Sequence, residues 1–415
     1  MCLLDQKTIE NSVRGTVWVV ALLLCLSATA AAQSGTYSNI IMYAVPTPNS
    51  APGGITLGPD GALWFTETVG NKIGRLSKSG PITEYAVPTP GSDPATITRG
   101  PNDDLWFTEW FGNKIGRITI AGAITEFLIP TPNCRPNGIT TGPDGALWFV
   151  EQQNTVSKIG RITTSGVITE YQGPPNTSPF WITVGPDGAL WFTENAASNI
   201  GRITTSGSVT EYPVAAPNSS ITTGPDGALW FTEFGGNKIG RITIGGAVTE
   251  YPVPTAGAAP DGIVTGPDGA LWFVEQFGNK VGRITTSGII TEFPGAGTEP
   301  LVITPGPDHA LWFTAYASNA IARAPVCALG LTASFAGSTL TTNFDLGVAQ
   351  SAIWSIHAGA TVLLRKEIPP VAPPRQFSVS FGAFPNKGNV TVTSVLSNGL
   401  GQTLCSEWTT VNTGP

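Results

Sequence analysis

Six glutamates occupy the same place in a repeated phrase and are the first candidates for chemistry. Each ends a copy of LWFTE or LWFVE: Glu67, Glu109, Glu151, Glu194, Glu233 and Glu275. The seventh copy ends in Ala315. Carboxylates gathered at one place can hold a hard cation such as Mg²⁺ or Ca²⁺, because these ions prefer oxygen ligands. A cation-binding site is therefore one interpretation of the six glutamates.

A lysine follows most of these glutamates at the spacing of a cross-strand partner. Across the next turn Glu67 would face Lys72, and Lys114, Lys158, Lys238 and Lys280 recur in the same way. Only Glu194 differs, because Ser198 and Asn199 stand in that place. Opposite charges directly across two strands stabilise a sheet modestly. The second interpretation is that these glutamates form structural ion pairs with the lysines.

The repeat that carries these residues predicts an all-β fold. Copies of GPDGALWFTE begin between 39 and 43 residues apart, at Gly58, Gly100, Gly142, Gly185, Gly224, Gly266 and Gly306. Each period holds four short apolar segments separated by Gly, Pro, Asn and Asp, the pattern of four strands joined by tight turns. Seven four-stranded units predict a seven-bladed β-propeller over residues 37–324.

The two ends of the repeat predict how the ring closes. An outer segment resembling ITEYPVPTP follows the first six copies but not the seventh, and an orphan copy, IIMYAVPTP, occupies residues 40–48. We expect this N-terminal strand to complete blade seven. Closure would leave no free sheet edge.

The segments outside the repeat predict export and a second domain. Residues 1–32 combine Arg14, the apolar run 17–26 and small residues before position 33, as in a cleavable secretory signal. The mature protein is expected to be secreted or periplasmic, monomeric, and without a membrane span. Residues 326–415 hold seven strand-like runs, which predict an immunoglobulin-like β-sandwich with a disulfide between Cys327 and Cys405. Cys134 is then a lone loop thiol.

The hairpin geometry predicts a binding site at one rim of the central channel. With GPDG as the turn, Leu57 faces Leu63 and Gly53 faces Glu67, because antiparallel partners share a constant index sum. We expect ligand contacts where this rim breaks the repeat, at Asn137, Phe180, Trp181, Asp261 and Glu299, beside the repeat glutamates Glu151, Glu194 and Glu275. The partner would be a small molecule or a protein. A net charge of −7 argues against nucleic acid.

Other repeated polar residues fit structural roles. The Asp of the GPDG turn favours the turn itself. The Arg of GRI and the Glu of ITEY are expected to bond between strands or between blades.

The blade phrase GPDGxLWFTE, followed by GNKIGRIT and ITEYPxPTP, resembles that of the virginiamycin B lyase (streptogramin lyase) family over residues 37–323. The resemblance implies a seven-bladed propeller. It also implies a Mg²⁺-dependent lyase that opens type B streptogramins at the ester linkage by elimination, an activity that gives antibiotic resistance.

The family's site residues map onto four positions of this chain. The family has a histidine before the inner strand of each of the last two blades, where this chain has Asp261 and Leu301. The glutamate two residues before the second histidine is kept as Glu299, and the last WFxE glutamate is Ala315. Neither Leu nor Ala can bind a metal or accept a proton.

Two functions remain open from the sequence. The first is an exported propeller that binds a ligand or partner at the channel rim without lyase chemistry. The second is a metal-dependent, lyase-like enzyme in which Asp261 and Glu299 act as catalytic groups and, with Glu275, hold Mg²⁺.

Overall fold

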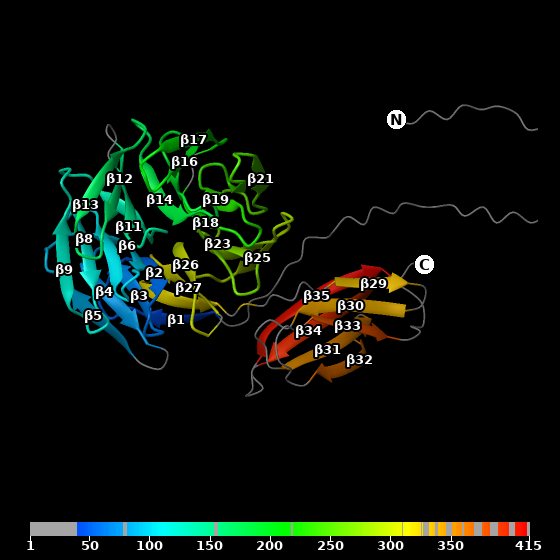
Figure 1. The fold of residues 1–415 in the computed structure, drawn as a ribbon. Coiled ribbons are helices and arrows are strands. Elements are labelled where there is room, and N and C mark those ends of the chain that lie inside the picture. Colours follow the sequence, from blue (N-terminus) through cyan, green and yellow to red (C-terminus); the bar gives the residue numbers. More distant parts are fainter. Residues whose placement is uncertain are drawn as a thin grey trace, which may run out of the picture. The chain divides into compact units, whose positions relative to one another are not determined.

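The computed structural model describes residues 40–324 except 78–80, 153–156, 217–218 and 309, together with residue 326 and the backbone of the strands between 332 and 412. The predicted signal segment 1–32 lies outside these residues. Seven antiparallel four-stranded sheets form a ring of blades (Figure 1). Within the described residues, no helix is long and apolar enough to cross a membrane.

Each blade is built from four consecutive strands, and the inner strands of neighbouring blades contact one another around the axis. The inner strands are β2 (Pro52–Leu57), β6 (Pro94–Arg99), β10 (Pro136–Thr141), β14 (Pro179–Val184), β18 (Ile221–Thr223), β22 (Pro260–Thr265) and β26 (Pro300–Pro305). The second strands are β3 (Leu63–Glu67), β7 (Leu105–Glu109), β11 (Leu147–Glu151), β15 (Leu190–Glu194), β19 (Leu229–Glu233), β23 (Leu271–Glu275) and β27 (Leu311–Ala315).

The third and fourth strands complete the blades. The third strands are β4 (Lys72–Leu76), β8 (Lys114–Ile118), β12 (Lys158–Ile162), β16 (Asn199–Ile203), β20 (Lys238–Ile242), β24 (Lys280–Ile284) and β28 (Ala320–Ala324). The outer strands are β5 (Ile82–Ala86), β9 (Ile124–Leu128), β13 (Ile168–Gln172), β17 (Val209–Pro213), β21 (Val248–Pro252), β25 (Ile290–Pro294) and, in blade 7, β1 (Ile41–Ala44).

The ring closes through β1. It pairs antiparallel with β28, with Ile41 opposite Arg323 and Ala44 opposite Ala320. The orphan copy of the outer segment therefore supplies the fourth strand of blade 7. A second contact closes the inner layer, because the Thr314 hydroxyl of blade 7 donates to the Gly53 carbonyl of blade 1 at 2.9 Å.

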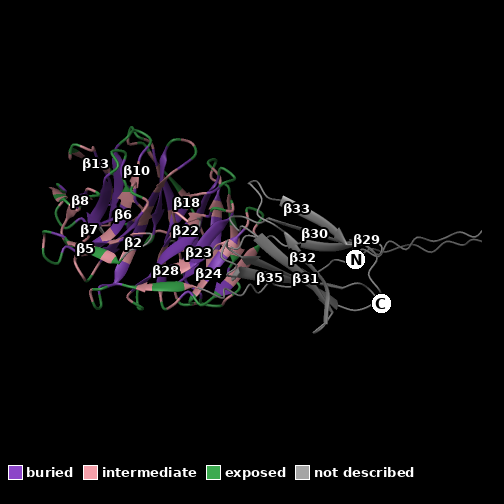
Figure 2. Ribbon diagram, turned by 90° about the horizontal axis from the view of Figure 1, so that it is seen from below, coloured by how far each residue is buried: buried purple, intermediate pink, exposed green. Residues whose placement is uncertain are grey.

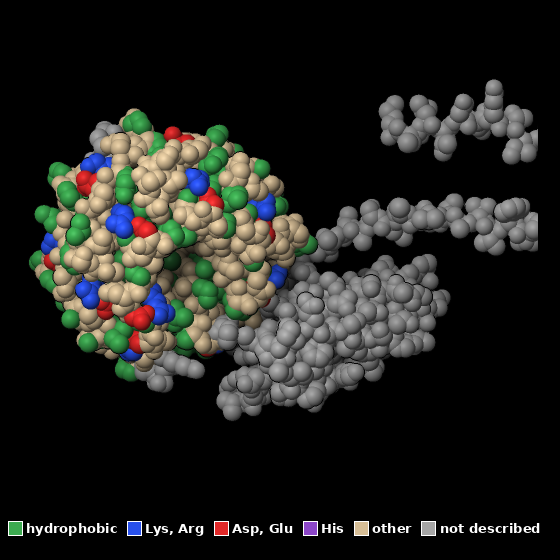
Figure 3. Space-filling view, in the orientation of Figure 1, with side chains coloured by type: hydrophobic (Ala, Val, Ile, Leu, Met, Phe, Trp, Pro, Cys, Tyr) green, Lys and Arg blue, Asp and Glu red, His purple; other side chains and the backbone are tan. Residues whose placement is uncertain are grey.

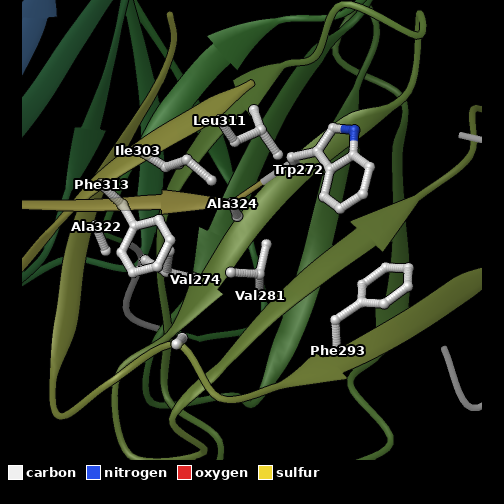
Figure 4. Packing of buried hydrophobic residues seen from close by; sticks show 10 residues of the cluster. Trp272, Val274, Val281, Phe293, Ile303, Leu311, Phe313, Ala322 and Ala324 are labelled. Carbon is white, nitrogen blue, oxygen red and sulfur yellow. The ribbon is translucent and has the colours of Figure 1, made fainter. Parts of the chain in front are cut away.

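The core lies between the blades, and the second strand of every blade is fully buried along its length (Figure 2). Figure 4 shows how blades 6 and 7 share one cluster: Trp272, Val274, Val281 and Phe293 pack against Ile303, Leu311 and Phe313. Each repeat tryptophan also packs on an outer-strand ring, as when Trp148 stacks on Tyr171 at 5.3 Å. The apolar repeat therefore stabilises the contacts between blades.

The glycine of GRI is required by this packing. A Cβ at Gly160 would lie 2.0 Å from Cζ of Phe149, the residue directly opposite on β11. The ring of Phe149 thus fills the space that a side chain at position 160 would need.

In the part of the chain that the structure describes, seven strands follow the propeller. β29 (Thr332–Ala336), β30 (Thr339–Asp345) and β33 (Gln376–Phe381) form one sheet, and β32 (Thr361–Ile368), β31 (Ser351–Ala358), β34 (Asn389–Ser397) and β35 (Thr403–Asn412) form another. Their packing into an immunoglobulin-like sandwich stays a prediction. Cys327 lies outside the described residues, so its bridge to Cys405 stays a prediction too.

Candidate functional site

The two ends of the propeller differ in how their polar groups are partnered. We call the end with the GPDG turns the turn end. The glutamate end is the opposite one, where inner strands begin and second strands finish. In Figure 3, basic and acidic side chains lie next to one another over the visible face, with no large patch of one sign.

At the turn end the polar groups are paired in a repeated cluster. In blade 3, Asp144 accepts hydrogen bonds from Trp148 Nε1 at 3.0 Å and from Arg161 Nε at 2.6 Å. Burial acts to raise the pKa of Asp144, but these hydrogen bonds outweigh it and the pKa is lowered. The pair of turn Asp and GRI Arg recurs in six blades, and in blade 2, where Asn102 takes the turn position, Arg117 pairs with Asp104 instead. The structural interpretation of the turn Asp and the GRI Arg is therefore confirmed.

At the glutamate end the predicted register is wrong by one residue. Ile55 lies opposite Phe65 as expected, but Pro52, not Gly53, lies opposite Glu67, because a β-bulge separates Pro52 from Ile55. The residue at the start of the bulge is a proline, which has no N–H to donate to the ladder. The Thr66 hydroxyl accepts from the Gly54 N–H at 2.8 Å in place of a regular ladder bond.

The sequence analysis placed the six repeat glutamates at the rim of the central channel. In the structure they do not line an open rim. Each is fully buried, and none of their side-chain oxygens has a hydrogen-bond partner in the described part of the chain. Burial first, and then the nearby outer-strand glutamate, raises the pKa to about 7 in Glu67 and Glu233 and to about 8 in the others, Glu109, Glu151, Glu194 and Glu275.

The lysines lie opposite these glutamates in register, yet their ammonium groups bind another acid. Lys72 is the Cα partner of Glu67, but its Nζ pairs with Glu84 Oε2 at 2.6 Å and also donates to Thr47 of the preceding blade. The outer-strand glutamate accepts from Thr47 as well. Because these contacts cross the blade junction, the expected bonding role of the ITEY glutamate is confirmed, whereas the expected ion pair of Glu67 is wrong.

The symmetry-breaking residues of the inner strands do gather at the glutamate end. Asn137 and Phe180 stand at the starts of the neighbouring strands β10 and β14, which approach so closely that a Cβ at Gly138 would lie 2.8 Å from Cα of Trp181. Asn137 is only 5% exposed, while Phe180 and Trp181 are partly exposed. Asn137, Phe180 and Trp181 therefore form an aromatic and amide arc at the starts of these inner strands, in which Trp181 also packs against the core between blades 4 and 5.

Asp261 sits further round the same ring of inner-strand starts. Its carboxylate accepts a hydrogen bond from the Ser219 hydroxyl, a partner that the sequence analysis did not identify. Burial raises the pKa of Asp261 to about 6, while the Ser219 bond lowers it. The only sequence signal was that Ser219 occupies the same repeat position as Asp261, one blade earlier.

Glu299, Leu301 and Ala315 lie in blade 7. Glu299 has a positive φ of 51°, which Ala51, Asp93, Arg135, Ser178 and Ala259 share at the same repeat position. Ala315 is fully buried opposite Pro300. Among the described residues, no group of three or more His, Cys, Asp or Glu side chains could hold a metal ion. The structure thus gives the proposed set of Asp261, Glu275 and Glu299 no support as a Mg²⁺ site.

The sequence analysis also missed exposed apolar side chains at the glutamate end. They lie in the turns between second and third strands, one or two residues after the repeat glutamate or its replacement: Val69, Phe111, Phe277 and Tyr316. Phe277 also meets Phe234 edge-on at 5.8 Å. The sequence signal for these side chains was the pair of variable residues that stands between WFTE and GN in the repeat. They add exposed apolar surface to the glutamate end in blades 1, 2, 6 and 7.

A cavity of about 250 Å³ lies elsewhere, at the turn end of the seam between blades 7 and 1, lined by Tyr43, Leu63, Asp308, Trp312 and Arg323 among others. It contains none of the predicted site residues.

Comparison with known proteins identifies the family to which this propeller belongs. The Virginiamycin B lyase family matches residues 7–174 and 152–336. The chain belongs to the virginiamycin B lyase family. A streptogramin B lyase structure is 42% identical with a TM-score of 0.65, over 69% of this chain and 96% of that one. Selenomethionine-substituted virginiamycin B lyase from Staphylococcus aureus gives the same identity and TM-score, over 69% and 98%.

Two further relatives bear on the site. A catalytically inactive histidine-to-alanine variant of the S. aureus enzyme, whose crystal structure is with quinupristin, is 41% identical with a TM-score of 0.65, over 69% of this chain and 98% of that one. A virginiamycin B lyase from Bacillus licheniformis is 55% identical over 40 residues, which span 10% of this chain and 14% of that protein. The family resemblance predicted from the blade phrase is therefore shown.

Proposed function

We propose that this chain is an exported, ligand-binding member of the family that does not open streptogramin rings. The observation that carries this is the content of the four family site positions. Leu301 and Ala315 offer no ligand atom and no base, and Ala315 is fully buried in β27. The residues present therefore do not fit the family's Mg²⁺.

Binding without cleavage has a parallel in the S. aureus relative. Its histidine-to-alanine variant is catalytically inactive and yet has a crystal structure with quinupristin. This chain contains only His309 and His357, and neither stands at a family site position. We therefore propose that the glutamate end keeps a seat for a cyclic depsipeptide ligand after losing the cleaving groups.

The proposed seat is the arc formed by Asn137, Phe180 and Trp181, continued by Ser219 and Asp261. Partly exposed aromatic faces next to a few fixed polar groups form the usual composition of a small-molecule site. The exposed apolar residues in the turns of the other blades at the glutamate end would extend the contact with a large ligand.

Calorimetric titration with quinupristin tests this seat. We expect saturable binding that weakens about tenfold in Phe180→Ala, because truncating an aromatic anchor costs more than about 1 kcal/mol and about 1.4 kcal/mol corresponds to a factor of ten. Leu128→Ala is the matched control, since Leu128 is 69% exposed on an outer strand and should leave the affinity unchanged. No binding, or equal losses in both variants, would refute the seat.

The second candidate, a metal-dependent enzyme, is favoured by one observation. A carboxyl group with a pKa of about 6, such as Asp261, is poised to exchange a proton near neutral pH. Ring opening that is lost in both Asp261→Asn and Glu299→Gln would establish this candidate in place of the first.

Export is part of the proposal and has its own test. Mass spectrometry of the protein recovered from outside the cytoplasm should show an N-terminus within a few residues of position 33. A protein retaining residues 1–32 would contradict export by a cleaved signal.

A further inference from the structure

Blade 4 keeps both glutamates of the repeat but loses the cation that binds them elsewhere. In blades 1, 2, 3, 5 and 6 a lysine ammonium contacts the outer-strand glutamate at 2.5–2.8 Å. In blade 4 the corresponding residue is Asn199, whose amide donates a hydrogen bond to Glu211 Oε1 at 2.9 Å. An amide carries no charge, so Glu194 and Glu211 face each other across Asn199 without a cation.

A second change, elsewhere in the chain, removes the other donors to the same glutamate. In blade 1 the Thr47 N–H and hydroxyl both donate to Glu84, and threonines at the same position serve blades 2, 3 and 6. That threonine stands five residues before the proline that opens the inner strand. In blade 4 the position holds Pro174, which has neither an N–H nor a hydroxyl.

The geometry places both carboxylates on one face of blade 4. Glu194 lies at the end of β15 directly opposite Asn199 on β16, and Asn199 contacts Glu211 on β17. Glu194 is fully buried, and neither of its oxygens has a hydrogen-bond partner among the described residues. Glu211, in contrast, is exposed. Glu194 avoids the cost of a buried charge while it holds a proton, and a cation bound between the two acids would displace that proton and stabilise both carboxylates.

We propose that blade 4 binds a hard divalent cation, Ca²⁺, between Glu194 and Glu211, in the place that a lysine ammonium occupies in five other blades. Ca²⁺ suits this place because it accepts six to eight oxygen ligands in irregular geometry, including amide oxygens and water. The exposed side of Glu211 leaves room for the water ligands. Mg²⁺ fits less well, since it demands near-ideal octahedral geometry. This cation site is independent of the proposed function, because it shares no residue with the ligand seat.

Titration of the metal-stripped full-length protein with CaCl2 tests the site. We expect one saturable site per chain with a Kd of about 10⁻⁴–10⁻³ M, the range of extracellular calcium modules, and a melting temperature that rises with Ca²⁺. Asn199→Lys restores the residue of the other blades, so it should fold. It should weaken Ca²⁺ binding at least about tenfold, because the new ammonium fills the site and repels the ion.

A matched pair of variants places the site in blade 4. Glu211→Gln should weaken Ca²⁺ binding as Asn199→Lys does. Glu170→Gln, at the equivalent position of blade 3 where Lys158 already pairs with the glutamate, should leave it unchanged. No saturable binding at millimolar Ca²⁺, or binding that survives both Asn199→Lys and Glu211→Gln, would overturn the proposal.

Discussion

The turn end and the glutamate end of the propeller are built from the same repeats, but they differ in whether their repeated acidic residues have hydrogen-bond partners. At the turn end each aspartate is partnered, as when Asp144 binds Trp148 and Arg161. At the glutamate end each repeat glutamate, such as Glu109, is fully buried without a hydrogen-bond partner in the described part of the chain. The contrast teaches that both ends pair charges across the ring, but only the glutamate end also keeps buried acids that its lysines do not bind.

The largest expected effect is in the packing that both ends share. Trp148→Ala should reduce the free energy of unfolding by about 3–5 kcal/mol, because the buried ring leaves a cavity between blades. Val167→Ala in the same blade is the control, since Val167 is 61% exposed and should cost less than about 0.5 kcal/mol. Similar losses in the two variants, measured by chemical denaturation, would contradict the account of the core.

The partnered aspartates should matter next. Asp144→Ala leaves the Trp148 indole N–H and the Arg161 guanidinium without their acceptor, so we expect a loss of about 1–3 kcal/mol in the same denaturation measurement. Asp144→Asn keeps an oxygen for Trp148 and should cost less. If both variants matched the parent, the partners of Asp144 would not stabilise the ring.

The unpartnered glutamates should give a smaller effect with the opposite sign. Their pKa lies at about 7 in Glu67 and about 8 in Glu109, against an ordinary value of 4.5. Between pH 4.5 and about 8 the native state therefore holds protons that the unfolded state has lost, so stability falls as pH rises through that window. The melting temperature should decrease from pH 5 to pH 8.

Glutamine substitutions sharpen this prediction. The double variant Glu67→Gln, Glu109→Gln mimics the protonated acids, so it should melt at least as high as the parent at pH 8 and show a shallower pH dependence. A double variant that is less stable than the parent at pH 8 would show that these carboxylates are ionised and bound.

The smallest effect concerns Cys134, which lies at the glutamate end next to Glu151. It is fully buried, and burial raises the pKa of its thiol, so the reactive thiolate is scarce in the native protein. We expect alkylation of Cys134 only after unfolding. Rapid labelling of the native protein, detected by mass spectrometry of peptides, would contradict this placement.

The closed ring of blades could be predicted from the sequence, because the repeat period and the additional N-terminal copy of the outer strand are visible in the sequence itself. Prediction from the sequence failed at Pro52, because a constant index sum allows no bulge, although the proline and the glycines after it were the available signal. It also failed at Lys72, because two glutamates compete for one ammonium and Thr47, from the preceding blade, favours Glu84. Ser219 was missed as a partner of Asp261, because contacts between inner strands depend on how neighbouring blades are set around the axis.

The most direct test of the central claim, that the glutamate end binds rather than cleaves, is incubation with quinupristin and Mg²⁺ followed by liquid chromatography and fragment-ion mass spectrometry. Separation is needed because ring opening by elimination leaves the mass unchanged. We predict that the ring stays intact at protein concentrations that bind the ligand. Accumulation of the opened isomer over many turnovers would contradict the account.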